Sequence, residues 1–181
     1  MQVVRTEIAE VLLLEPRVFG DERGFFFESY NRREFARDTG LDVEFVQDNH
    51  SRSKRNVLRG LHYQIRQAQG KLVRVTAGEV WDVAVDLRRS SPTFGKWTGF
   101  TLSAESWRIA WIPPGFAHGF IVTSESADVL YKATDYYAPE HERTLLWSDA
   151  ALGIRWPLAG APILAPKDAR GATLERAETY P

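Results

Sequence analysis

The chain has 181 residues, of which 44% are hydrophobic, and a formal net charge of −1. This length suffices for one well-packed core, and the near-neutral charge argues against a general nucleic-acid or membrane-surface role, which needs a basic excess. Cysteine is absent, which excludes disulfides, thiolate nucleophiles and zinc–thiolate sites. No stretch approaches the roughly 20 apolar residues of a membrane span, and the N-terminus lacks a secretory pattern, so we expect a cytoplasmic protein.

The first thirty residues predict short strands joined by a turn. The apolar run Val11–Leu14 indicates an early strand. Glycines around Asp21 mark a turn with Arg23 at its tip, and Phe25–Tyr30 is expected to return as a strand. Glu28 lies inside this aromatic strand, where it is either part of a structural ion pair or a ligand contact.

A helix is expected over residues 32–39, because Asn31 can cap its N-terminus and Gly40 can end it. The next segment, 45–51, predicts a strand that runs into polar residues. The period of two separates these polar residues into two faces: Gln47 and Asn49 on one, Asp48 and His50 on the other. Amides that face a cavity suit recognition of a base or sugar, and ordinary strand-end chemistry explains them equally well.

The stretch Asn56–Gln64 places a charged Arg59 and the imidazole of His62 among apolar residues. Burial of such groups against a core costs free energy unless they have a hydrogen-bond or ion-pair partner or serve a function. His62 is therefore either a proton-transfer residue or a hydrogen-bonded structural histidine. Strict alternation puts Arg59 and His62 on opposite faces, so both can reach one ligand only if the strand bends near Gly60. The basic residues before this stretch are expected in a solvated loop: Arg52, Lys54 and Arg55.

From Gly70 onward, alternation of apolar and polar residues predicts strand after strand, with a turn about every 8 to 12 residues. Lys71, Val73 and Val75 share one face of the first of these strands. With almost no helix, the pattern favours a single all-β domain over residues 1–181, either a sandwich or a barrel. Ser148–Gly153 indicates a capped helical turn, and alanine and proline dominate the tail after it.

The motifs of several enzyme classes are missing, since there is no GxGxxG after a strand, no P-loop and no nucleophile elbow. The run Pro113–His118 has the P-x-G-x-x-H shape of the second motif of cupins, which are double-stranded β-helices. Metal-binding cupins carry H-x-H in the first motif, where this chain has His62-Tyr63-Gln64. Two imidazoles do not make a persuasive metal site, so we expect a site without metal or cofactor.

The remaining reactive groups suit proton transfer. An imidazole and a phenol on opposite sides of a substrate can remove a proton from one face of a carbon beside a ketone and return another to the far face. Lys71 is a candidate donor to the transient enolate, and an aspartate on the far nitrogen of His62 would fix its tautomer. Taken singly, Tyr131 and His118 are better explained as structural residues, Lys71 as a solvated residue and Asp168 as an ordinary surface residue.

Several long motifs together resemble the dTDP-4-dehydrorhamnose 3,5-epimerase family. They are Asp21–Glu28, Phe45–Ser51, Asn56–His62, Gly70–Arg74, Gly78–Asp86, Pro92–Gly95, Trp111–Phe120 and Tyr131–Tyr137. The resemblance covers residues 3 to 170 in unbroken order and leaves out the last ten or so. It implies a cupin-type jelly roll, a homodimer, no metal, and a dTDP-4-keto-6-deoxy-glucose substrate inverted at carbons 3 and 5.

The resemblance also assigns roles to residues. It implies His62 as general base with Asp168 as its partner, Tyr131 as the acid that reprotonates, and Lys71 as stabiliser of the enolate. The positions that match its nucleotide-sugar contacts are Arg23, Glu28, Gln47, Asp48, Asn49, Arg59, His118, Glu142 and Lys167. Tyr137 matches the residue that stacks on thymine, although it can equally pack a strand end.

Three functions therefore compete. The first is the 3,5-epimerase. The second is a related enzyme that inverts a single carbon of the same dTDP-keto-sugar for antibiotic sugars. The third is a cupin that binds a nucleotide sugar without catalysis, which the joint presence of His62, Asp168, Lys71 and Tyr131 disfavours.

Overall fold

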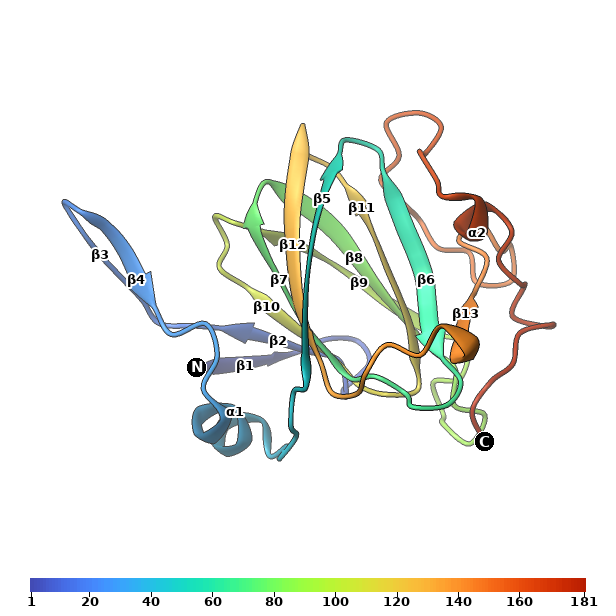
Figure 1. The fold of residues 1–181 in the computed structure, drawn as a ribbon, viewed down its shortest axis with the longest axis horizontal. Helices are drawn as coiled ribbons and strands as arrows, with labels where there is room; N and C mark the ends of the chain where they lie inside the picture. The colour runs from blue at the N-terminus through green and yellow to red at the C-terminus, as the bar shows by residue number, and fades with distance from the viewer.

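A computed structural model describes residues 1–181 as two antiparallel sheets that face each other (Figure 1). The six-stranded sheet has, in spatial order, β1 (Gln2–Arg5), β2 (Leu12–Glu15), β10 (Ile109–Ile112), β7 (Lys71–Ala77), β12 (Ser126–Ala133) and β5 (Gln47–Lys54). The five-stranded sheet has β13 (Glu142–Thr144), β6 (Leu58–Gln64), β11 (Phe116–Val122), β8 (Glu79–Asp86) and β9 (Trp97–Ser103). The predicted all-β architecture is confirmed.

The space between the sheets holds the largest apolar core. Val73 and Val75 of β7 meet Val80 and Ala84 of β8 there, each less than a tenth exposed. The predicted alternation explains this arrangement, because every second side chain of a strand points to the same face. Burial of this inner face is the main driving force that holds the two sheets together.

The outer faces of both sheets are covered in part. The C-terminal segment from Leu145 onward packs on the five-stranded sheet, where Leu152 and Ala177 bury the back of β6 and β8. Helix α1 (Arg32–Thr39) covers part of the six-stranded sheet through Phe35, which is 1% exposed. The predicted bounds and caps of α1 are confirmed, since the Asn31 side chain accepts two backbone N–H bonds and Gly40 is left-handed with φ 77°.

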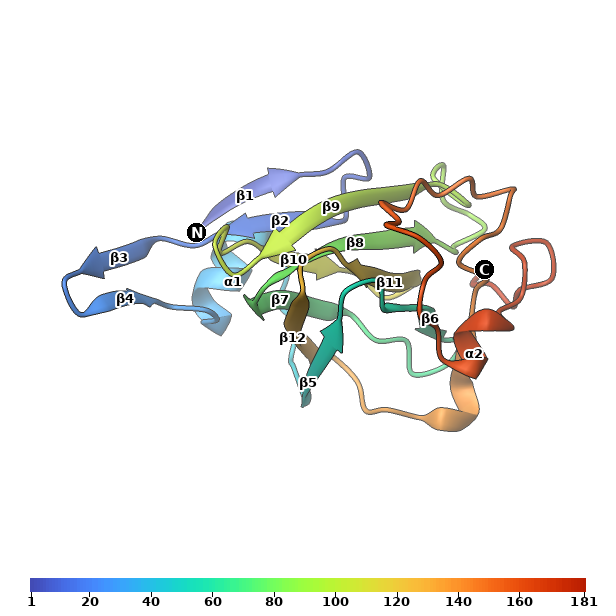
Figure 2. The same cartoon turned by 90° about the horizontal axis from the view of Figure 1, so that it is seen from above.

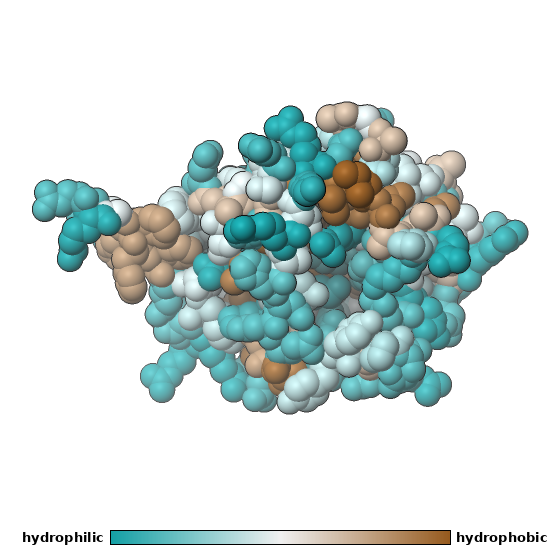
Figure 3. All heavy atoms as spheres, turned by 45° about the horizontal axis from the view of Figure 1, so that its top comes forward, coloured by the Kyte–Doolittle hydropathy of each residue, from teal (hydrophilic) through white to brown (hydrophobic).

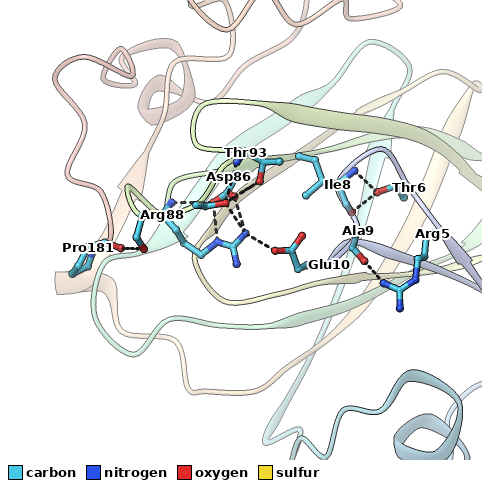
Figure 4. Close-up of polar contacts among 11 residues, drawn as sticks. Arg5, Thr6, Ile8, Ala9, Glu10, Asp86, Arg88, Thr93 and Pro181 are labelled. Atoms are coloured by element: carbon cyan, nitrogen blue, oxygen red, sulfur yellow. Dashed lines mark hydrogen bonds and ion pairs between the residues drawn. The ribbon is translucent and has the colours of Figure 1, made fainter.

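The end of β8 is anchored by a buried carboxylate (Figure 4). Asp86 is fully buried and accepts hydrogen bonds from the side chains of Arg88, Ser91 and Thr93. Burial raises the pKa of Asp86, but these hydrogen bonds outweigh it and lower the pKa to about 2. Arg88 also reaches Glu10, so the network links the β8–β9 connection to the N-terminal region.

A hairpin of β3 (Val18–Asp21) and β4 (Gly24–Phe27) projects from the body, at the opposite end of the molecule from α2 (Pro166–Ala169) (Figure 2). The turn at Asp21 was predicted, but the returning strand ends at Phe27 and does not extend to Tyr30. Short helix α2 was not predicted. A 3-10 turn, η1 (Pro139–His141), precedes β13.

The expectation of a solvated basic loop before β6 is confirmed for Arg55, which lies in an exposed turn, but it was wrong for Arg52 and Lys54. Arg52 and Lys54 lie in β5, and Arg52 donates two hydrogen bonds of 2.6 Å to the Asp128 carboxylate on β12. The cross-strand partner explains the difference, because a long strand can carry polar residues when its neighbour supplies matching charges.

No helix in the structure has the length and apolar character needed to cross a membrane.

Candidate active site

A cavity of about 410 Å³ lies between the two sheets, beside strands β5 and β6. All four predicted catalytic residues line it: His62, Lys71, Tyr131 and Asp168. Seven of the ten predicted ligand contacts line it as well: Gln47, Asn49, Arg59, His118, Tyr137, Glu142 and Lys167. The fold thus brings residues as distant in the chain as Gln47, on β5, and Asp168, on α2, to one cavity.

His62 and Asp168 form a close pair at the wall of this cavity. His62 Nε2 lies 2.6 Å from Asp168 Oδ1, and the Asp168 side chain is only 2% exposed. Helix α2 presents Asp168 to β6. The chain after α2 approaches the residues that follow β13 so closely that a Cβ on Gly171 would lie 2.7 Å from the Leu146 nitrogen, so only glycine fits there.

The bend predicted at Gly60 is confirmed. Gly60 has a φ of 116°, and the β6–β11 register shifts between the His62–His118 and Arg59–Phe120 pairs. A Cβ on Gly60 would come within 2.7 Å of the His118 carbonyl oxygen, which restricts this position to glycine. The bulge lets Arg59 and His62 line the same cavity, as simultaneous contact with one ligand requires.

Lys71 lies at the start of β7 and is 9% exposed. Its Nζ is 3.5 Å from the His62 carbonyl oxygen. Burial lowers the pKa of Lys71 to about 8, against the opposing attraction of Asp82 and Glu142. A buried ammonium without a direct carboxylate partner is well placed to receive negative charge that develops on a substrate.

Tyr131 approaches the cavity from the other sheet. It lies on β12 of the six-stranded sheet, whereas His62 lies on β6 of the five-stranded sheet (Figure 1). Burial raises the pKa of the Tyr131 phenol, and the negative charge of Glu142 raises it further. The phenol therefore stays protonated over the neutral range and can act as an acid.

His118 has a partner that the sequence reasoning missed. Its Nε2 lies 2.9 and 3.0 Å from the two carboxylate oxygens of Asp82, and both side chains are buried. The carboxylate holds the imidazole in one orientation at the cavity wall. The sequence did contain an indication of this pair, because Asp82 shares a strand face with the core residues Val80 and Ala84 and would need a partner when buried there.

Three predicted ligand contacts lie outside the cavity. Arg23 is at the tip of the β3–β4 hairpin and forms an ion pair with Asp21. Glu28, just after the hairpin, accepts a hydrogen bond from Asn31. Asp48 points to the outer face of the six-stranded sheet and pairs with Lys132 at 2.9 Å. Within one chain, the structure does not bring these three residues to His62.

Comparison with known proteins identifies the family. The sequence profile of the dTDP-4-dehydrorhamnose 3,5-epimerases matches residues 5–176. The chain belongs to the dTDP-4-dehydrorhamnose 3,5-epimerase family. A family member from Pseudomonas aeruginosa is 64% identical over 181 residues, which is the full length of both chains.

Solved structures of the family share the fold. The dTDP-6-deoxy-D-glucose-3,5-epimerase of Legionella pneumophila, solved with dTDP-4-keto-L-rhamnose, is 52% identical, with a TM-score of 0.96 over 98% of this chain and 94% of that one. ChmJ from Streptomyces bikiniensis, a 3'-monoepimerase solved with dTDP-quinovose, is 32% identical, with a TM-score of 0.89 over 97% and 88%. The predicted cupin jelly roll is confirmed by these neighbours.

Proposed function

We propose that this protein epimerises dTDP-4-dehydro-6-deoxy-D-glucose at carbons 3 and 5, to dTDP-4-dehydro-L-rhamnose, by proton transfer from its own side chains. The observation that carries the proposal is the His62–Asp168 pair on one sheet with Tyr131 on the other, around one cavity. Stereochemical inversion needs a base and an acid on opposite faces of the reacting carbon. The 64% identical family member and the ligand-bound Legionella structure support the substrate class.

In the proposed mechanism, His62 Nε2 is held by Asp168, so Nδ1 takes the proton from the carbon beside the ketone, and the electron pair of the broken C–H bond moves onto the ketone oxygen. Lys71 stabilises the resulting enolate as an ammonium. The electron pair then returns to the carbon, which takes a proton from the Tyr131 hydroxyl on the far face. Solvent removes the proton from His62 and reprotonates Tyr131, so atoms and charge balance over each inversion.

Asp168 is proposed to act on His62 through their 2.6 Å contact. A buried carboxylate beside an imidazole fixes its ring orientation and stabilises the imidazolium that forms on proton abstraction. Arg59 and Lys167, which line the same cavity, supply positive charge for the diphosphate. The remaining cavity-lining contacts, among them Asn49, His118, Tyr137 and Glu142, are proposed to hold the nucleotide and sugar.

We also propose that the protein acts as a homodimer in which the β3–β4 hairpin serves the partner's cavity. The hairpin extends away from its own chain's body, where Figure 3 shows apolar surface behind a hydrophilic tip. Phe19, Phe25 and Phe26 of the hairpin are each exposed by 50% or more. Apolar side chains so exposed on a protruding element are typical of an interface. Arg23 and Glu28 would then reach the ligand of the other subunit, since they cannot reach that of their own.

The reaction is tested with substrate in heavy water. Deuterium at both carbon 3 and carbon 5 supports the proposed double inversion. Label at a single carbon would instead select a single-carbon epimerase, the class to which the 3'-monoepimerase ChmJ belongs. No label, with dTDP still bound, would select a non-catalytic nucleotide-sugar-binding protein.

A further inference from the structure

The loop of residues 134–138 joins β12 to η1 and displays two aromatic side chains. Tyr136 is 61% exposed and Tyr137 is 52% exposed, and Tyr137 lines the cavity. Backbone contacts secure the two ends of the loop, where the Thr134 nitrogen donates to the Gly70 oxygen and the His141 nitrogen donates to the Ala138 oxygen. The intervening backbone depends on side chains for its hydrogen bonds.

Three glutamines supply most of those hydrogen bonds, and the Asp135 carboxylate accepts one more from the Tyr136 nitrogen at 2.8 Å. Gln69 Nε2 donates to the Asp135 oxygen at 2.8 Å. Gln64 Nε2 donates to the Tyr136 oxygen at 3.2 Å, and Gln64 Oε1 accepts from the Ala138 nitrogen at 2.9 Å. Gln47 Oε1 accepts from the Tyr137 nitrogen at 2.9 Å. Each of the four successive residues 135–138 is therefore bound through its backbone by a glutamine, and we call Gln47, Gln64 and Gln69 the glutamine clamp.

Gln64 and Gln47 differ in the capacity that they have left for a ligand. Gln64 is 4% exposed, and its amide nitrogen makes a further bond of 2.8 Å to the Gln67 oxygen. Gln47 Nε2 donates to Asn49 Oδ1 at 3.0 Å. Both polar atoms of Gln64 are engaged within the protein, so its effect on a ligand runs through the loop that it holds. Gln47 lines the cavity and keeps one N–H free, so it can support Tyr137 and contact the ligand as well.

We propose that the glutamine clamp positions Tyr137 to receive the nucleotide base, and that Gln64 and Gln69 are positioning residues for substrate affinity. This inference rests on the proposed function and deepens it. An exposed aromatic ring on a free loop loses conformational entropy when it stacks on a ligand, whereas a loop already fixed in place does not. The three glutamines come from β5, β6 and the β6–β7 connection, so the strand that carries His62 also fixes the base-binding loop.

The proposal predicts that loss of the clamp weakens binding of the base and leaves the chemistry intact. In Gln69→Met, which keeps side-chain length but removes the donor, we expect dTDP to bind about ten-fold more weakly, as the loss of one hydrogen bond and a freed loop imply. Binding of inorganic pyrophosphate, which has no base, stays unchanged. The rate of deuterium incorporation at saturating substrate also stays unchanged, so the Michaelis constant rises alone.

Gln67→Met is the matched control. Gln67 lies in the same β6–β7 connection and is exposed, and its side chain makes no hydrogen bond in the structure. We expect it to bind dTDP and pyrophosphate as the unmodified protein does. Gln64→Met removes two of the clamp's bonds to the loop and should weaken dTDP binding further; Gln69→Met keeps the test valid should Gln64→Met fail to fold.

A double-mutant cycle decides whether the effect runs through Tyr137. In a Tyr137→Ala background, Gln69→Met should cause no further loss of dTDP affinity. The proposal is overturned if Gln69→Met leaves dTDP affinity unchanged, weakens dTDP and pyrophosphate equally, or keeps its full effect without Tyr137. Failure of the proposed function is distinguishable, because it appears as absent deuterium incorporation in the unmodified protein.

Discussion

His62 and Asp168 are 106 positions apart in the chain, yet His62 Nε2 lies 2.6 Å from Asp168 Oδ1. His62 belongs to a central strand and Asp168 to a four-residue helix in the C-terminal segment. The contact therefore depends on how the C-terminal segment docks on the back and edge of the five-stranded sheet. This long-range contact gives the proposed base its orientation.

Asp168→Asn tests that orientation. The amide keeps the shape of the carboxylate but removes its charge, so the imidazolium loses its support and the tautomer of His62 changes. We expect deuterium incorporation to fall by about 10²–10⁴-fold. Calorimetric titration with dTDP should give nearly the affinity of the unmodified protein. A parallel loss of dTDP binding would instead assign Asp168 to the fold.

Lys71→Met should lower the activity and raise the stability of the protein. Because burial lowers the pKa of Lys71 from 10.5 to about 8, the folded protein bears the cost of a buried ammonium below pH 8. That cost, on the order of 3 kcal/mol, fades as pH rises from about 8 towards 10.5. The variant should therefore resist urea better than the unmodified protein at pH 7, and the difference should shrink above pH 8.

The ionisation of Lys71 should also set the alkaline limb of the pH–rate profile. Lys71 stabilises the enolate only as a cation, so the turnover number should fall as pH rises through about 8. A rate that stays constant to pH 10 would show that the charge of Lys71 has no part in the reaction.

Asp86 should support stability only above acidic pH. Its folded pKa of about 2 lies below the ordinary value of 3.8, so its contribution is complete above about pH 4 and is lost as pH falls towards 2. In urea unfolding, Asp86→Asn should be less stable at pH 7, and the gap should narrow by about 2 kcal/mol near pH 2. Asp42→Asn, at a 73% exposed carboxylate, is the control and should show little change at either pH.

Mixed dimers test whether the hairpin serves the partner's cavity. Arg23→Ala and His62→Ala chains, each weakly active or inactive alone, should regain activity when they are unfolded and refolded together. In a mixed dimer, one cavity has its own His62 and receives Arg23 from the partner. Random pairing predicts about a quarter of the unmodified activity. A mixture that stays inactive would place Arg23 outside the partner's site.

The sequence predicted the strands and their faces well because a period of two is a local property. Lys71 could be placed on one face with Val73 and Val75, and these two valines lie in the core between the sheets. Gly60 could be identified as a bend because Arg59 and His62 cannot otherwise share a side. These inferences needed only the residues next to each position.

Contacts made across the fold could not be predicted in the same way. Asp168 lies in a tail rich in alanine and proline, and no local pattern indicates that α2 returns to β6; only the family resemblance pointed to it. Arg52 was misplaced for the same reason, because its partner Asp128 lies 76 positions away on β12. The glutamine clamp also draws its members and their acceptors from distant segments.

The most direct test of the proposed proton transfer is His62→Ala in heavy water, with dTDP affinity measured on the same sample. We expect deuterium incorporation at carbons 3 and 5 to be abolished while dTDP binding is nearly intact. His141→Ala, at a histidine outside the cavity, should behave as the unmodified protein does. Deuterium incorporation that survives in His62→Ala would contradict the assignment of His62 as the base.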